Sequence, residues 1–521
     1  MKKSDSYLLL ALFAVLVPVV VFFKNAWVSD DAYIIFRSIE QLFAGNGPVW
    51  NPHERVQVFT SPLWFVVLSF TRIFSSDVFL NAIGISFVLL LSMLIVLRKL
   101  CGHAGYFLLI SILLVSSNAF FDYTSSGLEN VLGYFLLAGF AYFYHRLFLI
   151  REQEEIQVGV IRQLLICFGL VICVRHDLLL LTFPAVAYAV FTHFKFLTVK
   201  QWLREVGIAF VPIGLYTLFS VIYYGFPFPN TAYAKLTTGI PASDLVAQGF
   251  KYYLQTFQFD SLTGVVIITA LVVNLAKPRF VWMRYVCIGI ILNLLYVLKV
   301  GGDFMQGRFL SYSFLWSSIL LVQWFAGVQF QRKLVYGFVF LGAYFIVYPH
   351  TPLTSPIEFS GTNTRWGIAD ERGYYFKYSS LGEYLRSKRD GFLFPQHKSS
   401  MEGLKFKEAE EPLSIMTVIG FYGYHAGLEK MIVDPLALSD PLLARLPART
   451  NWRIGHFERD LPEGYIESIV MEREALGDPG LLEYYRNLQV ITKGEDLFDL
   501  ERLKMIFLFN IGAFDHLING S

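Results

Sequence analysis

Long apolar runs separated by short basic loops fill the chain up to about residue 347, and they predict eleven membrane-spanning helices. The runs lie near residues 7–23, 78–97, 104–117, 128–145, 161–174, 178–192, 207–223, 261–276, 281–298, 309–328 and 334–347. An apolar helix of about 20 residues crosses the hydrocarbon core of a bilayer. Several runs are shorter, which indicates tilted helices, spans completed by flanking residues, or half-helices.

The pattern changes after residue 347, where charged residues become dense and Pro and Gly interrupt every apolar run. This change predicts a separate soluble domain over residues 348–521, which at about 170 residues can bury a core of its own. Its pattern indicates a mixed α/β fold. Strands are expected at 414–420 and 430–433, and helices at 375–388 and 436–446. The apolar runs 508–513 and 515–518 predict a docking contact rather than membrane insertion.

The composition supports an integral membrane protein. The 521 residues are 55% hydrophobic and only 16% charged, whereas soluble proteins carry about 25% charged residues. The net charge of +2 does not indicate a nucleic-acid partner. The first run is expected to remain as a helix because no small-residue cleavage site follows it. The four cysteines lie in or beside apolar runs, so they offer no disulfide framework to residues 348–521.

The basic residues predict the orientation, because loops on the cytoplasmic side are rich in Lys and Arg. With the N-terminus inside, the inside loops contain Arg98, Lys99, Arg146, Arg162, Lys200, Arg204, Lys277 and Arg284. This count requires the apolar run 62–74 to lie in the outer leaflet, closing a first outside loop of residues 24–77. The odd number of spans then places the domain 348–521 outside.

Two adjacent carboxylates, Asp30 and Asp31, follow the first span. Charge at a membrane boundary is costly unless it is solvated or used in function. Neighbouring carboxylates raise each other's pKa, which suits a proton acceptor or a cation ligand. The pair equally well marks the water side of the interface, and position alone leaves the two interpretations open.

Most other boundary charges also fall on the predicted outside face. They are Arg37, Glu54, Glu129, Arg175, Asp177, Lys235, Asp303 and Arg308. A cavity lined by carboxylates and guanidinium groups suits a polyprenyl-phosphate sugar, because Arg and Lys pair phosphate and a carboxylate accepts the acceptor's proton. Structural alternatives stay open for three of the charges: Arg37 could snorkel, Arg175 could pair with Asp177, and Glu129 could stabilise a helix dipole.

Several motifs resemble a known family. They are Asp30-Asp31-Ala32-Tyr33-Ile34-Ile35-Phe36-Arg37, Gly45–Val56, Phe59–Trp64, Ser126–Glu129, Pro229–Lys235, Gly301–Arg308, Asp434–Asp440 and Arg453–His456. Together they resemble the GT-C membrane glycosyltransferases of the terminal β-(1→2) arabinofuranosyltransferase (AftB-like) group. The resemblance covers nearly the whole chain. One departure is Arg175-His176-Asp177, where the family pattern has Arg-Pro followed by an acidic residue.

The resemblance implies a GT-C fold and a multi-pass enzyme of the bacterial inner membrane, with its active site and C-terminal domain periplasmic. It implies transfer of a sugar, arabinofuranose or another pentose, from a polyprenyl phosphate to a glycan or surface-protein acceptor. By this resemblance, Asp30 and Asp31 are the expected catalytic acid/base residues. These two are also the expected ligands if a divalent cation binds, and metal dependence stays open.

The remaining site residues receive roles in the same prediction. Arg37, Arg175, Lys235 and Arg308 are expected to bind the donor phosphate. The residues Glu54, Glu129, Asp177, Asn230, Asp303, His425 and His456 are expected to bind substrate, although lone histidines are more often structural.

Two other functions are alternatives to a glycosyltransferase. A transporter or flippase of lipid-linked sugars would show paired broken helices with polar residues near mid-membrane. An O-antigen ligase or polymerase would also be polytopic with Arg-rich outside loops. The charges gathered on one face, the opening motif and the large outside domain favour the transferase.

Overall fold

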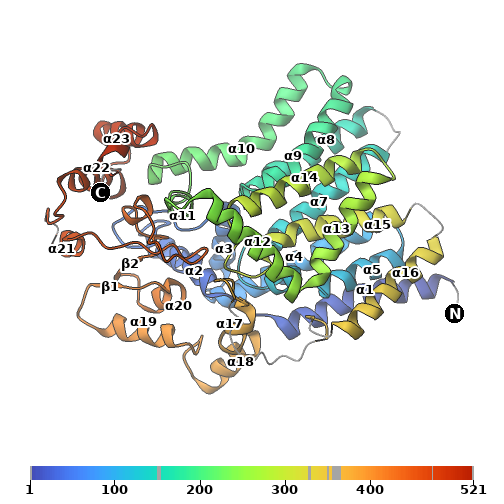
Figure 1. Ribbon diagram of the computed structural model, residues 1–521, viewed down its shortest axis with the longest axis horizontal. Helices are drawn as coiled ribbons and strands as arrows, with labels where there is room; N and C mark the ends of the chain where they lie inside the picture. Colours follow the sequence, from blue (N-terminus) through green and yellow to red (C-terminus); the bar gives the residue numbers. More distant parts are fainter. Residues whose placement is uncertain are drawn as a thin grey trace. The chain divides into compact units, whose positions relative to one another are not determined.

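The computed structural model describes residues 3–149, 154–326, 330–348, 351–354, 365–471 and 473–518. The chain forms two compact units (Figure 1). The first unit comprises Met1–Val28, Ser75–Ile213 and Ala242–Leu381, and the second comprises Ser29–Phe74, Gly214–Pro241 and Gly382–Ser521. Each unit is therefore assembled from three separate stretches of sequence.

The first unit is a helical bundle. Its helices are α1 (Lys3–Asn25), α4 (Val78–Cys101), α5 (Ala104–Val115), α6 (Asn118–Phe121), α7 (Asn130–Leu149), α8 (Glu154–Val174), α9 (Leu178–His193), the first half of α10 (Val199–Tyr224), α12 (Ala242–Phe259), α13 (Ser261–Ala276), α14 (Trp282–Lys299), α15 (Ser311–Phe325), α16 (Phe330–Val347) and α17 (Glu371–Ser379). Helix α1 packs on α5, α9 on α14, and α7 on both α4 and α8.

Among the described residues, seven helices are long and apolar enough to cross a membrane, or up to nine if each of two bent pairs counts as one span. The protein is therefore a multi-pass membrane protein. All eleven predicted runs lie on helices. Several of those helices are too short to cross a membrane alone. The prediction is therefore confirmed for the positions of the helices but not for eleven spans. The predicted run 309–328 ends partly outside the described residues.

Helix α12 was not predicted, because it is amphipathic and its hydropathy is too low for a span by itself. It is joined to α13 at an angle of 109°. The break lies at Asp260, whose buried carboxylate accepts from the Thr263 amide (3.2 Å) and the Ser117 hydroxyl (2.9 Å). The side chain caps α13 and ties the bend to the start of α6, which gives this corner of the bundle a defined geometry.

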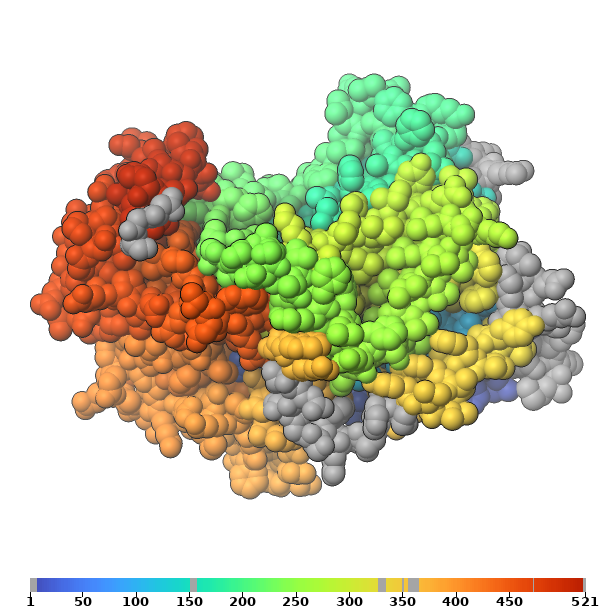
Figure 2. Space-filling view, viewed as in Figure 1, coloured from blue at the N-terminus to red at the C-terminus, as the bar shows by residue number. Residues whose placement is uncertain are grey.

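The second unit combines short helices with one small sheet. Its elements are α2 (Asp30–Phe43), α3 (Pro62–Phe74), the second half of α10, α11 (Asn230–Leu236), α18 (Leu381–Asp390), α19 (Lys398–Glu408), β1 (Leu413–Ile415), α20 (Ile419–His425), β2 (Met431–Val433), α21 (Tyr465–Val470), α22 (Pro479–Lys493) and α23 (Leu500–Asn510). Strands β1 and β2 pair in parallel, with Ser414 opposite Ile432. Figure 2 shows the C-terminal residues of this unit in orange and red.

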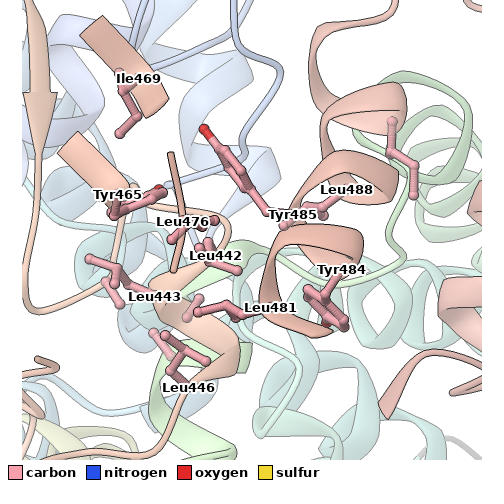
Figure 3. Close-up of a cluster of buried hydrophobic side chains, with 14 of the residues drawn as sticks. Leu442, Leu443, Leu446, Tyr465, Ile469, Leu476, Leu481, Tyr484, Tyr485 and Leu488 are labelled. Carbon is pink, nitrogen blue, oxygen red and sulfur yellow. The ribbon is translucent and has the colours of Figure 1, made fainter. Parts of the chain in front are cut away.

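Leucine and tyrosine side chains fill the larger core of the second unit (Figure 3). Leu442 and Leu443 are fully buried, and Tyr484 and Leu488 of α22 join the same cluster. The cluster also contains Phe226 and Ala234 from the middle of the chain. Hydrophobic burial therefore holds three distant segments of sequence in one unit.

The C-terminal part is mostly helical, so the mixed α/β prediction is confirmed only for one two-stranded sheet. The strand at 430–433 is confirmed by β2, whereas β1 ends at Ile415 and residues 419–420 begin a helix. The helix expected at 375–388 is two helices, α17 and α18, which meet at Ser380.

The helix expected at 436–446 is wrong, since only Leu443–Arg445 forms a 3₁₀ turn. Two buried carboxylates take the main-chain amides of this segment. Asp434 accepts from Leu436 (2.9 Å), and Asp440 accepts from Leu443 (2.8 Å). Such local side-chain bonds compete with helical hydrogen bonds, so the apolar periodicity does not produce a helix here.

Candidate functional site

Five charged side chains form a continuous chain in the first unit. Arg308 donates through Nη2 to Glu129 Oε1 at 2.9 Å, and Arg175 Nη1 lies 3.5 Å from the same oxygen. Arg175 also donates through Nε and Nη2 to the two carboxylate oxygens of Asp177, at 3.0 and 3.1 Å. At the other end, Arg308 Nη1 lies 3.7 Å from Asp303. The charge chain joins residues up to 179 positions apart in the sequence.

Burial and charge act in opposite directions on this chain. Burial alone would raise the pKa of Glu129, but the guanidinium groups of Arg308 and Arg175 outweigh it and lower that pKa. Burial would also lower the pKa of Arg175, yet Asp177 and Glu129 raise it well above its usual value. Both shifts favour the ionised forms of Glu129 and Arg175, and the carboxylates hold both arginines in fixed positions.

A glycine-rich loop places Arg308 beside Glu129. Gly302 has φ +80°, and a β-carbon there would lie 2.4 Å from the ring of Tyr252. Gly307 has φ +72°, and its β-carbon would lie 2.7 Å from that of Ala119. The Tyr252 hydroxyl bonds the loop by donating to Met305 O (3.2 Å) and accepting from Phe309 N (3.1 Å). The glycines thus allow a tight turn against buried walls.

An open apolar hollow of about 950 Å³ has a lining that on α9 begins at Leu179, two positions after Asp177. It follows α9 from Leu179 to Phe194 and is completed by residues of α8, α10 and α14, all of them apolar. Helix α9 has 16 residues, which corresponds to a length of about 24 Å. Asp177, one end of the charge chain, therefore precedes the α9 part of this apolar surface by two residues.

Asp30 is the central charge of the second unit. Its two carboxylate oxygens accept from the amides of Gly420 (3.1 Å) and Phe421 (2.8 Å), at the start of α20. Asp30 is only 6% exposed. Burial raises its pKa to about 7 against the effect of these hydrogen bonds, and the neighbouring charge of Asp31 raises it further.

Asp31 differs from Asp30 in being only partly buried. Among the described residues, no group of three or more His, Cys, Asp or Glu side chains converges as a set of metal ligands. The main-chain amides also occupy one position on each Asp30 oxygen. A carboxylate held by two N–H donors suits proton transfer better than the role of a full cation ligand.

Arg37 is fully buried and binds main-chain carbonyl groups. It donates to Trp50 O (3.1 Å), Gly427 O (2.7 Å) and Lys430 O (2.8 Å), and also to Gly423 O. These bonds join α2 to the segment around α20. The guanidinium therefore acts as an internal clamp and is not placed to bind a phosphate.

Glu54 and Asn230 lie in the interior of the second unit. Burial raises the pKa of Glu54 to about 7; Lys493 opposes this effect and Asp440 adds to it. The Asn230 amide donates to Ala437 O (3.0 Å) and Asp440 O (3.0 Å). Asn230 therefore holds α11 to the C-terminal segment. Glu54, with its pKa near 7, is the residue of the two that can exchange a proton at neutral pH.

The predicted histidines are uncharged at neutral pH. Burial lowers the pKa of His425 to about 4. Burial, reinforced by Arg453, lowers the pKa of His456 to about 3, with a smaller contribution from the exposed Lys235. The charge of Lys235 thus acts on His456 within the second unit.

No model of a protein family matches the chain. Two curated proteins align with most of it, and both are named terminal β-(1→2)-arabinofuranosyltransferase. The protein from Mycobacterium tuberculosis is 23% identical over 91% of this chain and 86% of its own length. The protein from Corynebacterium glutamicum is 25% identical over 82% of this chain and 72% of its own. This chain is a distant homologue of these arabinofuranosyltransferases.

Solved structures of an oligosaccharyltransferase from Archaeoglobus fulgidus are also similar. The crystal structure with Zn and sulfate has a TM-score of 0.45 at 12% identity, covering 82% of this chain and 62% of that one. The complex with an inhibitory peptide and a dolichol-phosphate has the same TM-score and identity, covering 84% and 65%. The chain thus spans less than two thirds of the length of these structures.

Several residues near the charge clusters were not predicted as site residues. Gln306, in the glycine-rich loop, is 5% exposed, and neither of its amide atoms has a partner among the described residues. The Tyr312 ring lies 5.9 Å from the Arg175 guanidinium, and Phe309 lies closer, at 4.5 Å. Their position beside Arg308 in sequence was the available signal. Gly420 and Phe421 carried no signal, because only their amides take part.

Proposed function

We propose that the protein is a membrane glycosyltransferase that moves a sugar, arabinofuranose in the first instance, from a polyprenyl phosphate to a cell-envelope glycan or surface-protein acceptor. One observation in the first unit carries this proposal: carboxylates fix a pair of arginines, and the α9 lining of an apolar hollow begins at Leu179, two residues after Asp177. That arrangement fits an amphiphile with an anionic head and a hydrocarbon tail. The homology to arabinofuranosyltransferases supports the pentose.

The first unit supplies the donor-binding part of this proposal. Arg175 and Arg308 pair the phosphate, and Glu129, Asp177 and Asp303 hold the guanidinium groups in position. Preorganised arginines stabilise the charge that develops on the departing phosphate. The polyprenyl tail lies along α9 in the apolar hollow. Gln306 contributes amide hydrogen bonds to the bound head group.

The second unit supplies the proton acceptor. Asp30 is the general base, because a pKa near 7 balances the ionised fraction against basicity at neutral pH. The amides of Gly420 and Phe421 orient its carboxylate, and Asp31 tunes it. The sugar–phosphate bond breaks as the acceptor oxygen attacks, the proton passes to Asp30, and the polyprenyl phosphate leaves.

The proposal includes the orientation and domain limits drawn from the sequence. The basic loops face the cytoplasm, and residues 348–521 face the periplasm together with Asp30 and Asp31. Activity assays with and without a chelator test whether a divalent cation at these two carboxylates is needed for transfer.

The proposal is tested with purified protein in liposomes. The protein is incubated with polyprenyl-phosphoarabinose and, separately, with a polyprenyl-phosphohexose. The mass of the glycan product is then measured. Transfer of a pentose alone is the expected result. Movement of lipid-linked sugar across the bilayer without any covalent product would instead identify a flippase, and polymer formation would identify a polymerase.

Arg308→Ala tests the phosphate contact. Loss of one guanidinium should raise the KM for the lipid donor at least tenfold, because a charge-assisted hydrogen bond contributes about 1.5–3 kcal/mol. The KM for the acceptor should change little. The measurement is initial rate against donor concentration.

Arg162→Ala is the matched control for that substitution. Arg162 pairs with Glu205 at 2.7 Å, also between two helices of the first unit, but outside the five-residue charge chain. Donor KM should stay at the wild-type value in this variant. Equal effects of the two substitutions would refute a specific phosphate contact at Arg308.

A further inference from the structure

Helix α23 carries an exposed apolar stripe. Leu500 is 82% exposed, Leu503 36% and Phe507 64%, and Ile511, which follows the helix, is 60% exposed. Spacings of three and four residues place these side chains on one face. Arg502 lies on the opposite side and is buried. Lys504, four residues after Leu500, is exposed on the same face. An exposed apolar face of this kind marks contact with another apolar phase.

The same helix is attached to the end of α10, a candidate membrane span. Arg502 donates to Ile222 O at 2.8 Å and to Tyr223 O at 2.9 Å. These carbonyl groups belong to the last turn of α10, where no intrahelical donor is available. Asn510 donates to Gly225 O at 2.8 Å. Figure 2 shows the red C-terminal residues against green ones in this part of the second unit.

The end of α10 has the features of a membrane boundary. Residues 207–224 contain no charged side chain and end in Tyr223 and Tyr224, and tyrosine favours the headgroup level. Eighteen helical residues rise about 27 Å, close to the hydrocarbon thickness. In the part of α10 within the second unit, Leu215 is 64% exposed and Leu218 57%. Such a surface belongs in lipid.

We propose that α23 lies in the membrane interface and that its stripe of Leu500, Leu503, Phe507 and Ile511 enters the lipid. Because Arg502 fixes α23 within one turn of the end of α10, the stripe continues the lipid-facing surface of that helix. Lys504 is exposed on the same helix, and its long side chain can reach a headgroup phosphate while its stem stays apolar. The occupant of this face is therefore a phospholipid bilayer, and α23 anchors the C-terminal segment to it.

Spin labelling of the full-length protein tests the anchor. The four native cysteines are replaced by alanine, and a nitroxide is attached at Leu500→Cys or Phe507→Cys. The protein is placed in liposomes of phosphatidylethanolamine and phosphatidylglycerol. Collision rates are measured with oxygen, which partitions into lipid, and with a water-soluble nickel chelate. Both labels should favour oxygen several-fold, as should a lipid-facing reference label at Leu218→Cys.

Glu501→Cys is the matched control, because it lies about 100° from Leu500 around the same helix. Its label should favour the nickel chelate. A nickel preference at Leu500→Cys and Phe507→Cys would overturn the proposal. Protection of those two labels from both reagents would also overturn it, since protein would then cover the stripe.

A second measurement does not depend on labels. Phe507→Glu should increase hydrogen exchange across residues 479–518 in liposomes, because a charge in the interface lifts the helix from the lipid. Glu501→Gln should leave exchange at the wild-type level. Wild-type exchange in Phe507→Glu would contradict the lipid contact.

Discussion

At the scale of single residues, side-chain type did not reveal whether a charge serves structure or chemistry. Arg37 and Arg308 both lie in family motifs at the predicted outside face. In the structure Arg37 binds four carbonyl oxygens, whereas Arg308 pairs with Glu129 and Asp303. The difference is in the partners, and a buried arginine satisfied by main-chain carbonyls has a structural role.

The aspartate pair offers the sharpest prediction at this scale. Burial and then Asp31 raise the pKa of Asp30 to about 7, so kcat/KM should rise with pH below about 7 and level off above it. Asp31→Asn removes a like charge beside Asp30, so the rising part of the kcat/KM profile should move to lower pH. Asp30→Asn should reduce the rate by about 10²–10⁴ at every pH. The measurement is kcat/KM from pH 5 to 9.

Thermal unfolding of both variants controls for loss of structure. If Asp30→Asn keeps wild-type activity while Asp31→Asn abolishes it, the two residues have the opposite roles. If the pH profile of kcat/KM in Asp31→Asn matches that of the wild type, Asp31 does not raise the pKa of Asp30.

At the scale of elements, the contact of α20 with α2 decides the environment of Asp30. A β-carbon at Gly420 would lie 2.0 Å from Asp30 O and 2.5 Å from its Oδ2. At Gly423 it would lie 2.5 Å from the Trp50 ring. Two glycines on a seven-residue helix thus allow the close approach that lets main-chain amides reach a carboxylate.

Gly420→Ala should therefore separate α20 from α2. We expect the second unit to lose about 1–3 kcal/mol of stability, as for other overpacked sites, and activity to fall because Asp30 loses its amide donors. Thermal unfolding and transfer rate measure the two effects. Gly214→Ala is the control, because no atom lies within 4 Å of its β-carbon position. Equal behaviour of the two variants would exclude a steric effect.

At the scale of the whole molecule, four buried carboxylates of the second unit have a raised pKa. Burial is the main cause in each case, and it raises the pKa of Asp30, Glu54 and Asp434 to about 7 and that of Asp440 to about 6. The folded unit therefore binds protons more tightly than the unfolded chain does. Its stability should be fully present below about pH 4 and decline as pH rises through 6 to 7.

Hydrogen exchange in liposomes tests this dependence. After correction for intrinsic rates, α22 and residues 431–446 should be better protected at pH 5.5 than at pH 7.5. Helix α7 of the first unit serves as an internal reference. Protection that increases with pH in the second unit would contradict the expected sign.

Much of the fold followed from local sequence. Each apolar run became a helix because length and hydropathy are properties of the segment itself. The predicted elements were wrong where contacts with distant or polar groups outweighed the local hydrophobic pattern. Asp434 and Asp440 accept hydrogen bonds from amides in the segment 436–446, where a helix was expected. Helix α12 was missed because its polar residues lower its hydropathy below that of a span.

The sequence by itself determined where the long apolar helices lie, which residues carry charge and which group of enzymes the motifs resemble. Only the tertiary structure decided how the charges pair. It joined Glu129 to Arg175 and Arg308, enclosed Arg37 among carbonyl groups and placed Asp30 against two amides. Pairing, burial and pKa depend on groups hundreds of residues apart, and local composition does not encode their distances.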